Sequence, residues 1–88
     1  MIRRRVVVHG RVQGVFFRDS VRRTAQQRGV NGWVANRPDG AVEAAFEGEP
    51  EAVERLIEFC RNGPRGARVD SVDVTDEEPE NLTAFDVR

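Results

Sequence analysis

The sequence contains one cysteine, one histidine, no tyrosine and no lysine among its 88 residues, and these shortages exclude several kinds of site. Cys60 has no partner for a disulfide within the chain, which fits a reducing compartment, so we expect a cytoplasmic protein. His9 has no cysteine or carboxylate at a spacing typical of metal ligands, so we expect no metal site.

The chain also lacks a long hydrophobic run and a strong excess of either charge. Its apolar run near the amino terminus, Val6 to Val8, is too short for an export signal or a membrane span. A formal net charge of -1 and a pI of about 5.8 argue against general nucleic-acid binding. The triplet Arg3 to Arg5 could mark a membrane or nucleic-acid patch, but acidic residues elsewhere balance it, and we interpret it as a solvated strand end. We expect neither a membrane nor a nucleic acid as a partner, whereas small anionic ligands remain possible.

The length and apolar content bound the size of the core. With 88 residues, of which 39% are hydrophobic, the chain suffices for one domain over residues 1–88 with a single core. We expect a monomer, as for other small and highly charged domains, although an edge strand could pair with another chain.

Hydrophobic periodicity predicts a strand and then a helix at the start of the chain. Val6 to Val8 show no polar alternation, which predicts a strand covered on both faces near the centre of a sheet. A helix is expected from about Asp19 to Arg28, because Gly29 follows and three apolar residues recur at helical spacing. These residues are Phe17, Val21 and Ala25.

The middle of the chain predicts a β-hairpin followed by a second helix. Residues 30–37 are strand-like, and Pro38-Asp39-Gly40 is a turn signal. Val42, Ala44 and Phe46 then alternate with Glu43 and Glu47. Pro50 suits the first turn of a helix, whose apolar stripe ends before Asn62. The stripe comprises Val53, Leu56, Ile57 and Cys60.

The last third predicts two further strands. Residues 65–67 are expected to form a loop, and the valines of residues 69–74 predict a strand whose parity slips once, which a bulge would explain. Residues 76–81, acidic and containing Pro79, are typical of a turn, and residues 83–87 alternate as a last short strand.

This order of elements predicts an α+β fold. Strand, helix, strand, strand, helix and strand, with a short C-terminal strand added, favour two helices packed on one face of an antiparallel sheet, a ferredoxin-like sandwich. Since that fold carries many activities, the site must decide the function.

The stretch from Gly10 to Arg18 lies between a strand and the start of a helix. Backbone N–H groups lack intrachain partners there and the helix dipole favours anions, so the loop could hold a phosphate. Gly14 would permit close backbone approach, and Arg18 offers a planar, always-charged fork that matches phosphate oxygens. A tight turn beside a solvated arginine would explain the same spacing. The stretch is neither a Walker loop nor a dinucleotide-binding pattern.

Two motifs resemble the signatures of the acylphosphatase family. The first is the stretch Val8-His9-Gly10-Arg11-Val12-Gln13-Gly14-Val15-Phe16-Phe17-Arg18. The second is Gly32-Trp33-Val34-Ala35-Asn36, followed by Gly40, Val42 and Gly48 with the family's internal spacings. The chain departs from the family at its end, because it lacks the aromatic-rich final strand and closes with Phe85-Asp86-Val87-Arg88.

This resemblance implies roles for particular residues. Arg18 and the backbone amides from Val12 or Gln13 to Arg18 would bind the phosphoryl group, and Asn36 would orient the attacking water. The implied loop comprises Gln13, Gly14, Val15, Phe16, Phe17 and Arg18. The implied reaction is hydrolysis of an acyl phosphate to a carboxylate and inorganic phosphate, without a metal, cofactor or covalent intermediate.

The same residues could serve other functions. A binding module that senses phosphate, carbamoyl phosphate or a related anion could use the same loop, and RNA binding is a third possibility. Asn36 could instead cap the turn that follows it.

The other residues of interest have expected places in the fold. Trp33 is expected to pack rather than stack on a ligand, and Phe16 to form a wall of the site. Phe17 and Cys60 are expected in the core, Gly32 to fit a close backbone, and the acidic residues of the 76–80 segment to be solvated.

Overall fold

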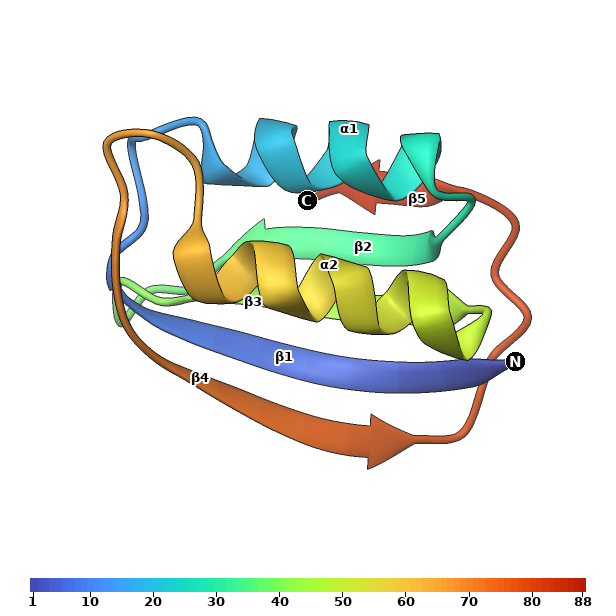
Figure 1. Cartoon of the computed structure of the whole chain (residues 1–88). Coiled ribbons are helices and arrows are strands. Elements are labelled where there is room, and N and C mark those ends of the chain that lie inside the picture. The colour runs from blue at the N-terminus through green and yellow to red at the C-terminus, as the bar shows by residue number, and fades with distance from the viewer.

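Five strands and two helices form in the computed structural model, which describes residues 1–88. They are β1 (Ile2–Arg11), α1 (Phe17–Gln27), β2 (Asn31–Asn36), β3 (Val42–Gly48), α2 (Pro50–Asn62), β4 (Arg68–Glu77) and β5 (Phe85–Val87). The strands make one sheet in the order β4-β1-β3-β2-β5, and both helices lie on the same face of it (Figure 1). The predicted ferredoxin-like fold is confirmed. Neither helix has the length and apolar content needed to cross a bilayer.

The sheet is antiparallel except at one edge. β1 pairs with β3 and β4, and β3 pairs with β2, all antiparallel, whereas β5 runs parallel to β2. The connection from β4 to β5 stays at one end of the sheet, which makes β5 antiparallel to β4 and therefore parallel to β2 (Figure 1). The prediction of an antiparallel sheet holds for the four longer strands and is wrong for β5.

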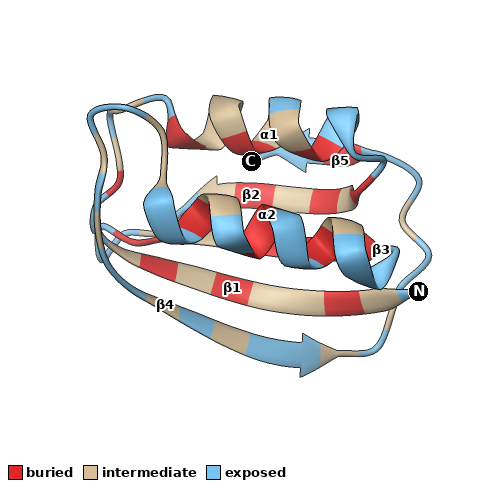
Figure 2. Cartoon of the chain, viewed as in Figure 1, coloured by how far each residue is buried: buried red, intermediate tan, exposed pale blue.

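The core lies between the helices and one face of the sheet. In β1, Val6 and Val8 are fully buried beneath the helices, whereas Val7 on the opposite face is half-buried. Buried segments accordingly alternate with intermediate ones along β1 (Figure 2). The prediction that this strand is covered on both faces is therefore wrong, although its place inside the sheet is confirmed. The predicted apolar stripes of both helices are buried: Phe17, Val21 and Ala25 in α1, and Val53, Leu56, Ile57 and Cys60 in α2.

Helix α1 begins at Phe17, two residues before the predicted start. Phe16 precedes it in a left-handed conformation with φ of 60°, and its carbonyl accepts the N–H of Ser20 at 3.0 Å. The cap position is occupied by Phe16 instead of the usual Ser, Thr, Asp or Asn, so no side chain caps this end and the sequence gives no signal for it. The other end follows the prediction, because Gly29 has φ of 68°.

The predicted bulge in β4 is confirmed, and a glycine of β1 accompanies it. The pairing of β1 with β4 shifts between His9, opposite Ser71, and Gly10, opposite Val69, which leaves Asp70 as the extra residue. A Cβ at Gly10 would lie 2.2 Å from the carbonyl oxygen of Arg68. Only glycine therefore lets the two strands approach so closely.

The arginine triplet is not a solvated strand end. Arg3 is 2% exposed, and its guanidinium contacts Glu47 at 3.3 Å and Glu77 at 2.9 Å. Glu47 also accepts the backbone N–H groups of Glu80 and Leu82 at 2.6 and 2.7 Å. The segment between β4 and β5 is thereby fastened over the sheet face opposite the helices, which explains why this arginine is buried.

That network also corrects the interpretation of the acidic segment. β4 continues to Glu77, so the predicted turn at residues 76–81 starts too early. Glu77 pairs with Arg5 at 3.1 Å as well as with Arg3, and Glu80 lies 3.4 Å from Arg3. Part of the cluster is therefore engaged in ion pairs rather than simply solvated. The last strand covers only residues 85–87, with Thr83 outside it.

Candidate functional site

The loop between β1 and α1 presents a series of unpartnered backbone N–H groups. None of the N–H groups from Gln13 to Asp19 donates a hydrogen bond within the chain. The chain turns there through two left-handed residues, Gly14 with φ of 74° and Phe16 with φ of 60°. Since the positive end of the α1 dipole lies at the same place, the loop offers an anion both donors and a favourable field.

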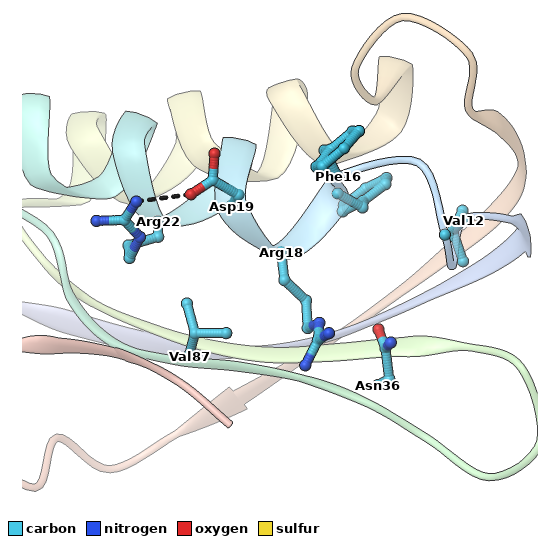
Figure 3. Close-up of a pocket in the computed structure, with 9 residues that line it drawn as sticks. Val12, Phe16, Arg18, Asp19, Arg22, Asn36 and Val87 are labelled. Carbon is cyan, nitrogen blue, oxygen red and sulfur yellow. Dashed lines mark hydrogen bonds and ion pairs between the residues drawn. The ribbon is translucent and has the colours of Figure 1, made fainter.

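A pocket of about 470 Å³ opens beside this loop (Figure 3). Helix α1 and the loop form one side of it, and the ends of β2 and β5 form the other. Its lining comprises Val12, Gly14, Phe16, Phe17, Arg18, Asp19, Arg22, Asn36 and Val87. The structure thus brings the two predicted catalytic residues, which lie on different elements, to a single pocket.

Arg18 lies in the first turn of α1, and its side chain extends across the pocket toward Asn36 (Figure 3). Its Nη1 atom donates to the main-chain oxygen of Arg88 at 2.9 Å. A guanidinium has five N–H donors, so most of its donors remain for a ligand.

Asn36 is the last residue of β2, and its side chain is exposed without a hydrogen bond inside the chain. It does not cap the following turn. That turn is capped by Asp39, whose Oδ1 accepts the N–H of Ala41 at 3.1 Å and whose Oδ2 accepts from Arg37 at 2.9 Å. The N–H of Ala41, helped by Arg37, holds the pKa of Asp39 below its ordinary value. The amide of Asn36 is therefore available to the pocket.

The other predicted loop residues divide into two groups. Gly14, Phe16 and Phe17 line the pocket, with Phe16 82% exposed as a wall and Phe17 2% exposed in the core, as expected. Gln13 and Val15 do not line it. The side chain of Gln13 points to the β2–β3 turn instead, where it donates to two carbonyl oxygens.

Sequence reasoning missed several residues of the pocket wall. Asp19 accepts from Arg22 at 2.6 Å and lies 3.2 Å from Nε of Arg23, and the hydrogen bond from Arg22 holds the pKa of Asp19 below its ordinary value. The spacing of these residues on one helix could have revealed the pair. Val87 and Arg88 reach the site only because β5 lies beside β2. No local feature of the sequence predicts that pairing.

The remaining candidates are placed away from the pocket. Cys60 is 1% exposed in the core, and burial raises the pKa of its thiol to about 12, as suits an inert core residue. His9 contacts Asp73 at 3.0 Å. A Cβ at Gly32 would lie 1.8 Å from the carbonyl oxygen of Ala45, which confirms the expected backbone fit. Trp33 packs against the guanidinium groups of Arg5 and Arg88, at 5.1 and 4.7 Å from its ring centre.

Comparison with known proteins identifies the family. The profile of the acylphosphatase family matches residues 4–87. The chain belongs to the acylphosphatase family. An acylphosphatase of Gloeobacter violaceus is 56% identical over 86 residues, which cover 98% of this chain and 92% of that protein. An acylphosphatase of Rubrobacter xylanophilus is 58% identical over 86 residues, which cover 96% of this chain and 77% of that protein.

The fold agrees with this family membership. The crystal structure of acylphosphatase from Bacillus subtilis superimposes with a TM-score of 0.96 at 38% sequence identity, and the match covers 100% of this chain and 99% of that chain. The predicted resemblance to acylphosphatases is thus confirmed over nearly the whole length. Acylphosphatases hydrolyse acyl phosphates, so family membership makes the chain a hydrolase that acts on acid anhydrides.

Proposed function

We propose that this acylphosphatase holds the phosphoryl group of an acyl phosphate with its loop amides and Arg18, and that Asn36 positions the attacking water. No metal, cofactor or covalent intermediate takes part. The observation that carries the proposal is the run of unpartnered N–H groups from Gln13 to Asp19, which adjoins a pocket lined by both Arg18 and the unbonded Asn36. The inorganic phosphate formed would leave from the same loop.

The division of labour follows from the chemistry of phosphoryl transfer. The transition state is loose and carries its charge on the equatorial phosphate oxygens, so the protein must mainly position the reactants and stabilise charge. The loop amides and the α1 dipole supply fixed partial charges, and the guanidinium of Arg18 supplies a full positive charge in a planar fork. The hydrogen bond to Arg88 and the helix backbone hold these groups in position, and fixed charges of this kind make electrostatic stabilisation effective.

The reaction needs no strong base on the protein. The oxygen of a water held by the Asn36 amide attacks phosphorus as the bond from phosphorus to the carboxyl oxygen breaks. The carboxylate leaves with the bonding electron pair, and a phosphate oxygen of the substrate takes the proton from water. Because a carboxylate is a good leaving group, an amide that orients water suffices, and a carboxylate base is not required.

We further propose that residues 1–88 act as one domain and as a monomer in the cytoplasm. Every residue assigned to the site comes from this one chain, so no second copy is needed to complete it. The single cysteine is buried, which suits a reducing compartment. Light scattering at working concentration, with activity per chain independent of dilution, would support the monomer.

The test is phosphate release from acetyl phosphate with a chelator present, for the native chain, Arg18→Ala and Asn36→Ala. Losing the Arg18 contacts should lower the rate by about a hundredfold or more. Arg55→Ala is the control, because this arginine lies on α2 outside the pocket, pairs only with Glu51 and is 59% exposed. Circular dichroism establishes that each variant folds.

Inhibition by inorganic phosphate separates the two roles. Arg18→Ala should bind phosphate much more weakly, whereas Asn36→Ala should bind it normally and turn over slowly. Normal turnover by a folded Arg18→Ala chain would overturn the assignment. Phosphate binding without any native turnover would instead favour an anion sensor.

A further inference from the structure

The side chain of Gln13 joins the two loops that border the pocket. Its Nε2 atom donates to the carbonyl oxygen of Arg37 at 2.8 Å and to that of Ala41 at 2.9 Å. Both amide protons are therefore used, and both go to main-chain oxygens of the β2–β3 turn, 24 and 28 residues away in the sequence. Gln13 holds the position of the turn rather than contacting the ligand space.

The two carbonyl groups belong to Arg37 and Ala41, the residues that close the β2–β3 turn. The N–H of Arg37 donates to the oxygen of Ala41 at 2.8 Å, and the N–H of Gly40 donates to the oxygen of Arg37 at 3.1 Å. Each oxygen thus accepts one bond from within the turn and one from Gln13. Arg37 directly follows Asn36 in the sequence. The Gln13 amide therefore binds the backbone one residue after Asn36, whose side chain lines the pocket.

No other hydrogen bond connects the loop of residues 12–16 with the turn of residues 36–41. Asn36 itself makes none with its side chain, and Arg18 is anchored elsewhere, on Arg88. The sheet also holds Asn36, because it lies opposite Val42 of β3, which pairs with Val8 of β1. Beyond this pairing and apolar packing, the relative position of the anion-binding loop and the β2–β3 turn depends on Gln13.

We propose that Gln13 is a positioning residue that fixes the distance between the loop-bound phosphoryl group and the water held by Asn36. This role rests on the proposed function, and it makes one side chain responsible for the separation between the water and the phosphoryl group. In-line attack depends on the separation of water and phosphorus, and a misplacement of about 1 Å can lower a rate on the order of a hundredfold. Glutamine suits this task because its amide supplies two protons from one nitrogen, whereas glutamate and methionine supply none.

A brace of this kind should affect turnover and not phosphate affinity. The loop amides and Arg18 remain in place without Gln13, so inorganic phosphate should inhibit as before. Sheet pairing would still hold the backbone of β2, but the turn that follows Asn36 would shift relative to the loop, so the effect should appear in kcat. A residue that only stabilised the fold would lower the melting temperature and leave kcat of the folded protein unchanged.

The experiment compares Gln13→Met, which keeps the length of the side chain and removes both donors, with Gln26→Met. Gln26 is exposed near the end of α1 and makes no side-chain hydrogen bond, so it is a control for the same chemical change. We expect kcat on acetyl phosphate to fall by about tenfold to a hundredfold in Gln13→Met, with phosphate inhibition unchanged within about twofold. Gln26→Met should match the native chain in both.

The same substitution in an Asn36→Ala background tests whether Gln13 acts through Asn36. If it does, Gln13→Met should lower kcat there by less than about twofold, because coupled residues are not additive. Full additivity, an unchanged kcat in the single variant, or a parallel loss of phosphate affinity would each overturn the proposal. Should Gln13→Met fail to fold, Gln13→Asn, which is too short to reach both carbonyls, is measured in the same way.

These outcomes are separable from those of the proposed function. If the native chain hydrolyses acetyl phosphate and Asn36→Ala loses turnover, the proposed function stands whatever Gln13→Met does. If Asn36→Ala retains full turnover, the water-positioning role fails, and the role assigned to Gln13 fails with it.

Discussion

Nη1 of Arg18 donates a hydrogen bond to the main-chain oxygen of Arg88, 2.9 Å away and 70 residues later in the chain. Arg88 is itself held, because its N–H donates to the carbonyl of Val34 at 2.8 Å and its guanidinium lies 4.7 Å from the ring centre of Trp33. The edge strand β5 thus places one acceptor where it can hold the only arginine that extends across the pocket toward Asn36 (Figure 3).

Ending the chain at Val87 should therefore lower activity, whereas Arg88→Ala should largely preserve it. The substitution keeps the main-chain oxygen, while the truncation removes it and also the bond to Val34. A hydrogen bond to a charged group contributes about 1.5–3 kcal/mol, so a loss on the order of tenfold to a hundredfold in kcat/KM for acetyl phosphate is expected. Equal activities of the two chains would show that Arg18 needs no support from β5.

Phe16 carries strain at the edge of the pocket. It has φ of 60° and is 82% exposed, so an unfavourable left-handed backbone is not offset by burial of its ring. Asparagine tolerates this conformation, and Asn81 adopts the same φ in this chain. Phe16→Asn should therefore raise the free energy of unfolding by about 0.5–1 kcal/mol, measured by urea denaturation.

The same variant tests what the exposed ring does for substrate. As a wall of the pocket, Phe16 offers an apolar surface to the acyl group. Phe16→Asn should raise KM for an aromatic acyl phosphate several-fold, on the order of 1 kcal/mol of lost contact, and change KM for acetyl phosphate less. A variant that is less stable than the native chain, or that shows the same KM change for both substrates, would contradict this account.

The features that the sequence could predict are those with a local physical cause. Unpartnered N–H groups at a helix start and the stripe of α2 follow from neighbouring residues. A glycine inside a strand predicts a close backbone approach, although its partner is known only from the fold. The partners of Arg18 and Gln13 do not, because they depend on strands that meet only in the folded chain. Arg3 shows the same limit, since three arginines at the start of β1 predict solvation unless the segment between β4 and β5 is known to be bound to Glu47 over them.

The buried pair of Arg3 and Glu47 should be important for stability. Glu47 is 1% exposed and is bound by Arg3 and by two backbone N–H groups, so Glu47→Gln would leave the charge of Arg3 with less compensation. Breaking a buried pair costs about 3–5 kcal/mol, and the remaining contact of Arg3 with Glu77 favours the lower part of that range.

Glu54→Gln is the matched control for this prediction. Glu54 pairs with Arg4 at 2.9 Å but is 54% exposed, so its substitution should cost less than about 1 kcal/mol. Urea denaturation of both variants at neutral pH measures the difference. Similar losses for Glu47→Gln and Glu54→Gln would mean that burial adds nothing to the Arg3 pair.

The carboxylates of this network should also make the protein sensitive to acid. Burial alone would raise the pKa of Glu47, but the N–H groups of Glu80 and Leu82 together with Arg3 outweigh it and lower the pKa. The hydrogen bond from Arg3, with the charges of Arg5 and Arg3, lowers the pKa of Glu77. A carboxyl whose folded pKa lies below its unfolded value binds more protons when the chain unfolds. Its contribution is therefore complete above the unfolded pKa and is lost as pH falls through the folded pKa.

Stability should consequently be level above about pH 5.5 and fall steadily below about pH 4.5, the region in which unfolded glutamates bind protons. Urea denaturation from pH 7 to pH 3 at constant ionic strength measures this slope. Glu47→Gln should start lower at neutral pH and show a shallower fall, because one of the titrating groups is gone. An acid slope as steep in Glu47→Gln as in the native chain would show that Glu47 keeps an ordinary pKa in the folded state, and that its hydrogen bonds to Glu80 and Leu82 do no more than offset its burial.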